Sequence, residues 1–294
     1  MSTAPLSKER SKAMLMLAAT AAMWSIGGLL IKMVDASPFS IAGARAAITS
    51  IVLLIYLKKP KFNWSLPQVG AAISSSATAI LFITATKTTT AANAILLQST
   101  APIYVAILGS WLLKEKATKY DWLTVAVVMG GMGLFFVGGL SAKGLFGNVC
   151  AVVSGITYAF FVIFMRMQKD GSPLESTLLA NIITAVIGLP FLCRSVPNTS
   201  GWFLLLILGV FQLGIPYVFY SAAIKKATAL EAVLISIVEP ILNPLLVFLA
   251  LGEAPGIYAL LGGAIVLASI TLKCVLTILP LRIVTEDNKE QPLD

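Results

Sequence analysis

Glu239 is the residue with the most unusual chemical setting in the sequence, because it is a carboxylate inside a long apolar run. A charged side chain at the centre of a membrane helix costs about 2.5–3.5 kcal/mol on insertion scales. Such a side chain is expected to face the protein interior, to be protonated, or to meet a cation. Ser236 and Asn243 lie three residues before it and four after it, on the same helical face. Glu239 is therefore a candidate for ion coupling or for cation binding, or else a framework residue that hydrogen-bonds the backbone.

Prolines near the middle of two apolar runs form a second set of candidates. A proline inside a helix cannot donate to the carbonyl four residues before it, so Pro102 and Pro240 free the carbonyls of Gln98 and Ser236. Pro244 does the same for the carbonyl of Pro240. At membrane depth a freed carbonyl needs a partner or a wet cavity. We predict that Pro102, Pro240 and Pro244 are hinges beside a polar path, the alternative being kinks that neighbouring helices satisfy.

Residues for enzymatic or metal chemistry are scarce. The sequence has no histidine, the commonest general base and metal ligand. Cys150, Cys193 and Cys274 lie in or beside apolar runs without metal-ligand spacing. The sequence also has no GxxxxGK[ST] loop for ATP. We therefore predict no catalytic residue, no metal, no cofactor and no ATPase subunit.

The composition predicts the elements that position these residues. Of the 294 residues, 58% are apolar and 12% are charged, against about 45–50% and about 25% in soluble domains. A membrane helix needs about 20 apolar residues, and ten runs qualify: 13–33, 38–57, 67–84, 91–113, 121–139, 147–167, 174–193, 201–223, 229–251 and 256–280. The first run also resembles a signal peptide, but its apolar length is that of a span. The predicted class is an all-α, multi-pass protein of the inner or plasma membrane, with the lipid bilayer as its surroundings.

The basic residues predict the orientation. Fifteen of the 21 Lys and Arg residues fall in the two tails and in the connections on one side of the membrane, and two fall inside helices. The opposite side has Lys32, Lys87, Lys143 and Arg194. The positive-inside rule then places both tails, residues 1–12 and 281–294, in the cytoplasm. The net charge of +8 is thereby explained by topology, and no nucleic-acid partner is expected.

The two halves of the chain resemble each other. An offset of 134 residues aligns Trp24 with Tyr158, and an offset of 138 aligns Pro102 with Pro240. Each half has five predicted helices, an odd number, so equivalent positions face opposite sides of the membrane. Inverted repeats are typical of secondary transporters. The predicted units are residues 13–139 and 147–280.

An ordered set of short motifs resembles a known family. The set consists of Met23–Gly28, Pro38, Arg45, Thr90–Ala92, Pro102 and Glu115 in the first half, and of Ala229–Ala232, Glu239–Pro240, Leu251–Glu253 and Gly262 in the second. It resembles two EamA units of the drug/metabolite transporter superfamily, except that Ser25 stands where the family usually has glycine. The resemblance implies a ten-helix permease whose central cavity is lined by helices 1, 3, 4, 6, 8 and 9, as in bacterial aromatic amino-acid exporters.

Polar and aromatic residues on those helices are the candidate cavity lining. Asn93, Thr100 and Tyr104 share one face of the fourth run, and Gln98 is adjacent. The full set is Trp24, Ser25, Asn93, Gln98, Thr100, Tyr104, Tyr158, Gln212, Tyr217, Tyr220, Glu239 and Asn243. For each residue taken alone, packing between helices is the competing interpretation.

Two cations fall within predicted helices. For Arg45 we expect a structural role, in which it snorkels or pairs with Asp35 or Glu253. For Lys273, near the inner end of the last helix, we expect snorkelling.

The sequence as a whole predicts a secondary active or facilitative transporter of a small organic metabolite, with export of amino acids or related compounds as the leading hypothesis. The alternative within transport is uptake of a cationic or zwitterionic metabolite, which Glu239 would suit. A polytopic membrane enzyme is the alternative from another class.

Overall fold

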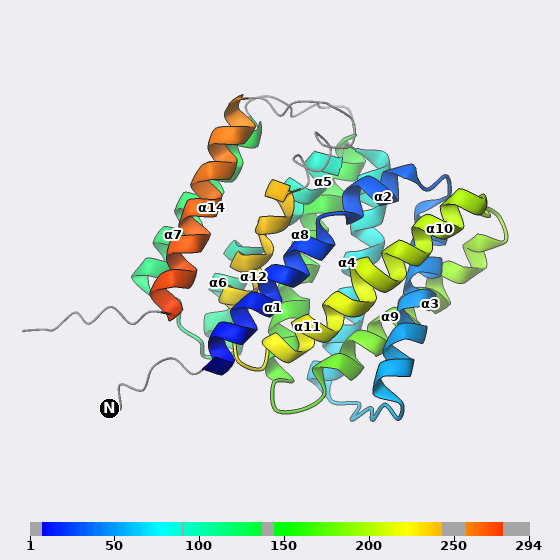
Figure 1. The fold of residues 1–294 in the computed structure, drawn as a ribbon, viewed down its shortest axis with the longest axis horizontal. Coiled ribbons are helices and arrows are strands. Elements are labelled where there is room, and N and C mark those ends of the chain that lie inside the picture. Colours follow the sequence, from blue (N-terminus) through cyan, green and yellow to red (C-terminus); the bar gives the residue numbers. More distant parts are fainter. Residues whose placement is uncertain (1–7, 90, 137–143, 243–256, 279–294) are drawn as a thin grey trace, which may run out of the picture.

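The computed structural model describes residues 8–89, 91–136, 144–242 and 257–278, and every regular element in these ranges is a helix. The N-terminal elements are α1 (Lys8–Trp24), α2 (Gly27–Met33), α3 (Pro38–Leu57), α4 (Leu66–Thr88), α5 (Ala91–Gln98), α6 (Ala101–Leu112) and α7 (Lys119–Phe136). The others are α8 (Leu145–Met167), α9 (Pro173–Leu192), α10 (Thr199–Ile207), the π-helix η1 (Leu208–Gly214), α11 (Ile215–Ala223), α12 (Ala229–Ser236) and α14 (Ile257–Ile278). The all-helical prediction is confirmed for these ranges (Figure 1).

Among the described residues, 6 helical stretches are long and apolar enough to cross a membrane. They are Glu9–Met33, Pro38–Leu57, Leu66–Thr88, Leu145–Met167, Pro173–Leu192 and Thr199–Ala223, and each coincides with a predicted run. Ala101–Leu112 and Leu261–Lys273 are shorter apolar helices. The total of ten spans stays a prediction.

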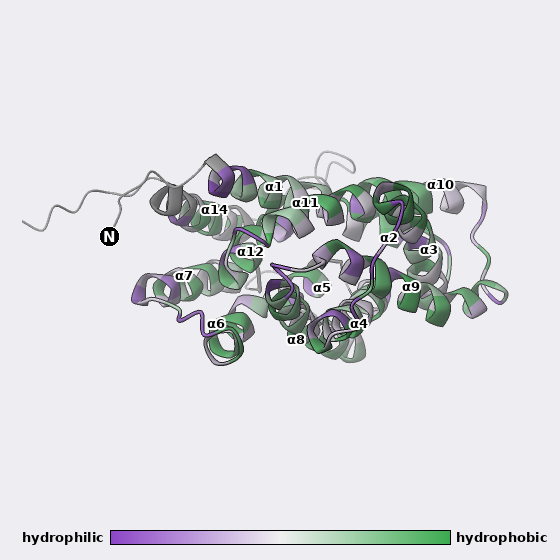
Figure 2. Ribbon diagram, turned by 90° about the horizontal axis from the view of Figure 1, so that it is seen from below, coloured by the Kyte–Doolittle hydropathy of each residue, from purple (hydrophilic) through white to green (hydrophobic). Residues whose placement is uncertain are grey.

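The outside of the bundle is apolar. Ile55, Leu145 and Val186 are largely exposed, although side chains of this kind are usually buried in soluble proteins. Figure 2 shows hydrophobic colouring along most of the helices. An exterior of this kind matches a hydrocarbon environment, so the multi-pass membrane prediction agrees with the surface.

Several helices begin at residues that cap their free backbone donors. The side chains of Ser37, Ser65 and Asn198 accept from the backbone N–H three residues later, at the starts of α3, α4 and α10. Thr228 and Glu231 form a capping box at the start of α12. Local sequence thus fixes where these helices start.

Helices far apart in the sequence pack closely around the centre. A Cβ atom on Gly43 of α3 would lie 2.4 Å from the carbonyl carbon of Gly188 in α9, so the two backbones are in direct contact. A hydrogen bond of 2.8 Å joins the hydroxyl groups of Thr78 in α4 and Thr157 in α8. These contacts fix α3 and α4, which contribute the polar residues described below.

Ion pairs join the connections at one end of the bundle. They are Arg10–Glu231 and Arg166–Glu115, both at 2.6 Å, and Lys226–Glu9 at 2.9 Å. Lys273 of α14 pairs with Asp121 of α7, so it has an ionic partner and does not simply snorkel. All these residues belong to the side that the charge distribution predicts to be cytoplasmic.

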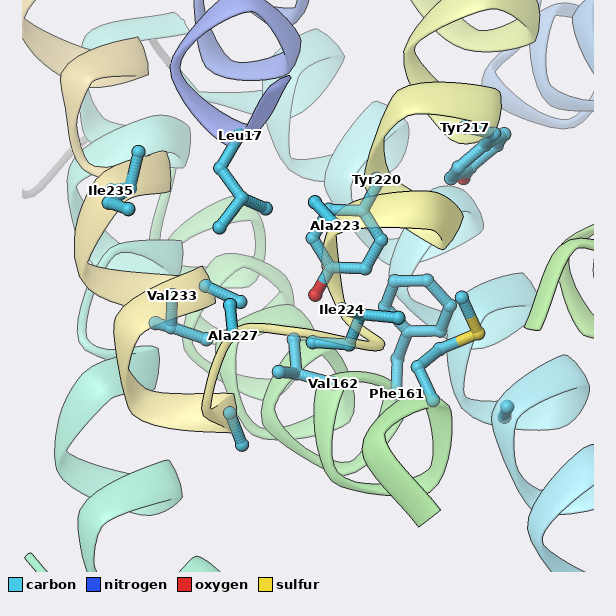
Figure 3. Close-up of a cluster of buried hydrophobic side chains, with 14 of the residues drawn as sticks. Leu17, Phe161, Val162, Tyr217, Tyr220, Ala223, Ile224, Ala227, Val233 and Ile235 are labelled. Carbon is cyan, nitrogen blue, oxygen red and sulfur yellow. The ribbon is translucent and has the colours of Figure 1, made fainter. Parts of the chain in front are cut away.

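A buried apolar cluster fills the space between α1, α8, α11 and α12 (Figure 3). Tyr220 extends from α11 toward Phe161 of α8, and their ring centroids are 5.8 Å apart. Leu17 of α1 and Ile235 of α12 belong to the same cluster. This cluster supports one wall of the cavity described next.

Candidate functional site

A cavity lies among α1, α3, α4, α8, η1 and α11. Its lining combines opposite charges, amides, hydroxyls and aromatic rings. The lining residues are Trp24, Arg45, Ser75, Thr78, Ala79, Phe82, Gln98, Tyr158, Phe161, Gln212, Leu213, Tyr217 and Glu239. Six of these were candidates from the sequence: Trp24, Gln98, Tyr158, Gln212, Tyr217 and Glu239. The structure thus brings half of the predicted set to one place.

Four of the lining residues lie at interruptions of helices. Trp24 is the last residue of α1, and Gln98 is the last residue of α5. Gln212 lies inside the π-helix η1, and Glu239 follows a turn at Ile237. Backbone groups left free by such interruptions are tolerated within a membrane where protein or a water-filled cavity satisfies them. The interruptions therefore contribute polar backbone as well as side chains to this region.

Prolines account for two of the interruptions. Pro102 follows Gln98 by four residues, and α5 ends at Gln98. Pro240 follows Ser236 by four residues, and α12 ends at Ser236. The helices are thus interrupted beside both prolines, and their action as hinges stays a prediction.

The freed backbone at the end of α5 packs directly against α8. A Cβ atom on Gly155 would lie 2.8 Å from the carbonyl oxygen of Gln98 and 3.3 Å from Oγ1 of Thr100. This close approach requires glycine at position 155. Tyr158 is one helical turn further along α8, so the approach also sets the position of a lining aromatic ring.

Gln212 connects three elements of the site. Its Oε1 accepts a hydrogen bond from Nη1 of Arg45 at 3.2 Å, and its Nε2 donates to the carbonyl of Trp24 at 3.4 Å. A Cβ atom on Gly27 would lie 2.7 Å from this Nε2, so glycine leaves room for the amide. Pro216 follows Gln212 by four residues and cannot donate to its carbonyl. This proline is the signal by which the interruption at η1 could have been found in the sequence.

The expectation that Arg45 snorkels is wrong. Arg45 is only 4% exposed, and it lines the cavity. In the described residues Asp35 forms no ion pair with it, and Glu253 lies outside those residues. The guanidinium stays inside the protein because Gln212 accepts one of its hydrogen bonds.

Aromatic rings form one wall of the cavity. The ring of Trp24 lies 6.3 Å from those of Tyr158 and Tyr217, edge to face in both cases. Tyr220 packs behind, 5.6 Å from Trp24. Edge-to-face pairs of this kind hold rings in fixed orientations. The wall can therefore offer ring faces to an apolar or cationic group.

The other described members of the predicted set lie outside the lining. They are Ser25, Asn93, Thr100, Tyr104 and Tyr220. Ser25 and Thr100 donate to nearby backbone carbonyls at 2.8 Å, and Tyr220 is fully buried. Asn93 is buried with Thr89 in reach, and Tyr104 is partly buried at the edge of the apolar cluster. Asn243 and Pro244 lie outside the described residues.

The family resemblance implied that the third predicted helix, α4, lines the cavity, but sequence reasoning named none of its lining residues. Ser75, Thr78, Ala79 and Phe82 line the cavity from this helix, and none of them was a candidate. The signal was present, since hydroxyl residues are grouped at positions 74–76 and 78 within an otherwise apolar span. Arg45, Phe161 and Leu213 are further lining residues that were not predicted as such.

An apolar helical bundle with a polar internal cavity at interrupted helices defines a multi-pass membrane protein of the transporter class. The chain belongs to the EamA-like transporter family, whose family model matches residues 11–137 and residues 145–273. It is a multi-pass protein of the cell membrane.

Relatives of the chain are named as uncharacterized transporters. An uncharacterized transporter of Archaeoglobus fulgidus is 29% identical over 205 residues, which cover 69% of this chain and 74% of that protein. A second from the same organism is 27% identical over 284 residues, covering 89% and 97%. The uncharacterized transporter YetK of Bacillus subtilis is 26% identical over 240 residues, covering 72% and 70%. A crystal structure with 17% identity superposes with a TM-score of 0.75 over 90% of this chain and 97% of that one, so the fold is shared.

Proposed function

We propose that this protein is a secondary active or facilitative transporter that exports amino acids or related small metabolites by alternating access. The proposal rests on the polar and aromatic cavity bordered by four helix interruptions. Aromatic faces, amides and one residue of each charge sign match the apolar and polar parts of an amino acid.

We further propose ten membrane helices in two inverted five-helix repeats, with both termini in the cytoplasm. The two separate matches of the family model support a duplication. Interruptions beside Pro102 and Pro240, which are related by the offset of 138, support it as well. The ion pairs Arg10–Glu231 and Lys226–Glu9 join the N-terminal segment to the connection before α12. An even number of spans between these two segments would place them on the same side of the membrane.

Glu239 is proposed as the coupling residue. It shares the cavity with Arg45, and the two side chains attract each other electrostatically. A proton and a substrate ammonium would compete for the same carboxylate, and such competition is the basis of exchange between the two. Tyr158 and Tyr217 are the other titratable side chains in the lining.

Uptake of a cationic or zwitterionic metabolite is the second candidate, favoured by the carboxylate of Glu239 in the cavity. Flux measured in proteoliposomes with a panel of amino acids, their amides and organic cations separates the two. Efflux of amino acids in exchange for protons that enter down an imposed gradient supports the proposal. Movement of cations alone supports the second candidate. Product formation from labelled lipid without solute movement would instead indicate an enzyme.

A further inference from the structure

Arg45 is a buried cation whose hydrogen bonding is incomplete. Arg45 is 4% exposed, and its Nη1 donates a hydrogen bond to Oε1 of Gln212. Among the described residues, no acceptor lies within hydrogen-bonding distance of its Nε, and no carboxylate oxygen lies within 4.0 Å of the guanidinium. Glu239 lines the same cavity and attracts Arg45 only from a longer distance.

A second donor on the same cavity is also unpaired. Nε1 of Trp24 is buried and has no acceptor within the described part of the chain. Buried donors without partners are costly, since each loses its hydrogen bonds to water. Two such donors on residues that line one cavity indicate a ligand that carries acceptors.

The backbone around Arg45 is fixed. Thr49, one turn further along α3, donates to the carbonyl of Gly209 in η1 at 2.9 Å. A Cβ atom on Gly209 would lie 2.5 Å from Ile48, so α3 and η1 are in close contact. Gln212, on the same π-helix, then orients the guanidinium. The arginine is thus held in place before a ligand binds, which reduces the entropy lost on binding.

We propose that Arg45 binds the carboxylate of the transported compound, with the indole N–H of Trp24 as a further donor. The planar guanidinium presents a fork of donors that fits the two oxygens of a carboxylate. Glu239 supplies the opposite charge in the same cavity, so the preferred compound is a zwitterion. This inference rests on the proposed transport function and narrows its substrate class.

The test compares matched solutes in proteoliposomes containing the full chain. The probes are phenylalanine, phenylalanine amide and phenethylamine, which share the ring and the amine but differ in the carboxylate. For the wild type we expect flux of phenylalanine to exceed flux of the other two. A charge-assisted hydrogen bond pair contributes enough affinity that Arg45→Gln should raise the half-saturation concentration for phenylalanine by about 10- to 100-fold. The half-saturation concentrations for the amide and the amine should change little.

A second variant tests the inference if Arg45→Gln fails to fold, and a third variant serves as the control. Gln212→Glu keeps the arginine but gives it an internal carboxylate partner, which should compete with the substrate and weaken phenylalanine transport selectively. Lys59→Gln, which removes an exposed positive charge, is the control and should resemble the wild type.

The outcomes separate the inference from the function on which it rests. Loss of the preference for phenylalanine in Arg45→Gln or Gln212→Glu supports the carboxylate site. If the wild type moves the amide or the amine as well as the acid, or if both variants keep the preference, the carboxylate site is refuted while transport stands. If the wild type moves none of the three solutes and no other amino acid of the panel described above, both the carboxylate site and the amino-acid transport proposal fail.

Discussion

Gly155 offers a test of whether the interrupted helix of α5 and α6 must pack directly on α8. In Gly155→Ala, the new methyl group would lie 2.8 Å from the carbonyl oxygen of Gln98 and 3.3 Å from its Cα. Both are backbone atoms, so the two elements must separate. Overpacking of this kind typically destabilises by about 1–3 kcal/mol. Alanine also gains about 1 kcal/mol over glycine in helix propensity, so the net effect is expected to be about 0–2 kcal/mol.

A control isolates the packing effect. Gly130→Ala in α7 gains the same propensity, and a Cβ atom there would meet nothing within 4 Å. The free energy of unfolding of the two variants, measured by denaturant titration in the same detergent, should therefore differ by about 1–3 kcal/mol. The transport rate should also fall in Gly155→Ala, because Tyr158 on the same face of α8 would shift. Equal stability of the two variants would refute the close packing.

Three further predictions concern the hinge, the coupling residue and the topology. Pro240→Ala restores a backbone donor and should lower the transport rate more than the amount of folded protein; an unchanged rate would assign Pro240 to packing alone. Glu239→Gln keeps the size of the side chain but cannot titrate, so substrate flux should lose its dependence on an imposed pH gradient, and a retained dependence would place coupling elsewhere. In a cysteine-free background, a single cysteine at Asp35 should react with an impermeant thiol reagent in intact cells and one at Lys61 should not, whereas the reverse pattern would invert the topology.

The sequence predicted the six full-length spans because each is a long apolar run ended by charge or proline. It also located the interruptions near Pro102 and Pro240, where a missing donor has a direct structural consequence. The interruption after Trp24 was not predicted, since no proline marks it. Its carbonyl is satisfied by Gln212, a contact 188 residues away in sequence.

The role of Arg45 could not be read from its position in the helix. A buried and a snorkelling arginine have the same sequence context, and the difference depends on whether a neighbouring helix supplies an acceptor. Here Gln212 does so from a π-helix, an element that hydropathy does not reveal. The polar face of α4 was overlooked for a related reason, because serine and threonine in membrane helices usually bond to their own backbone.

If the solute passes through the cavity lined by Arg45 and Glu239, a large side chain placed in that cavity should block its passage. Ala79 of α4 lines the cavity, whereas Ile73 of the same helix is 57% exposed on the outer surface. Phenylalanine counterflow should be measured in proteoliposomes that contain equal amounts of folded Ala79→Trp, Ile73→Trp or wild type. We expect loss of counterflow in Ala79→Trp and near wild-type counterflow in Ile73→Trp. Full counterflow in Ala79→Trp would show that the solute does not pass through this cavity.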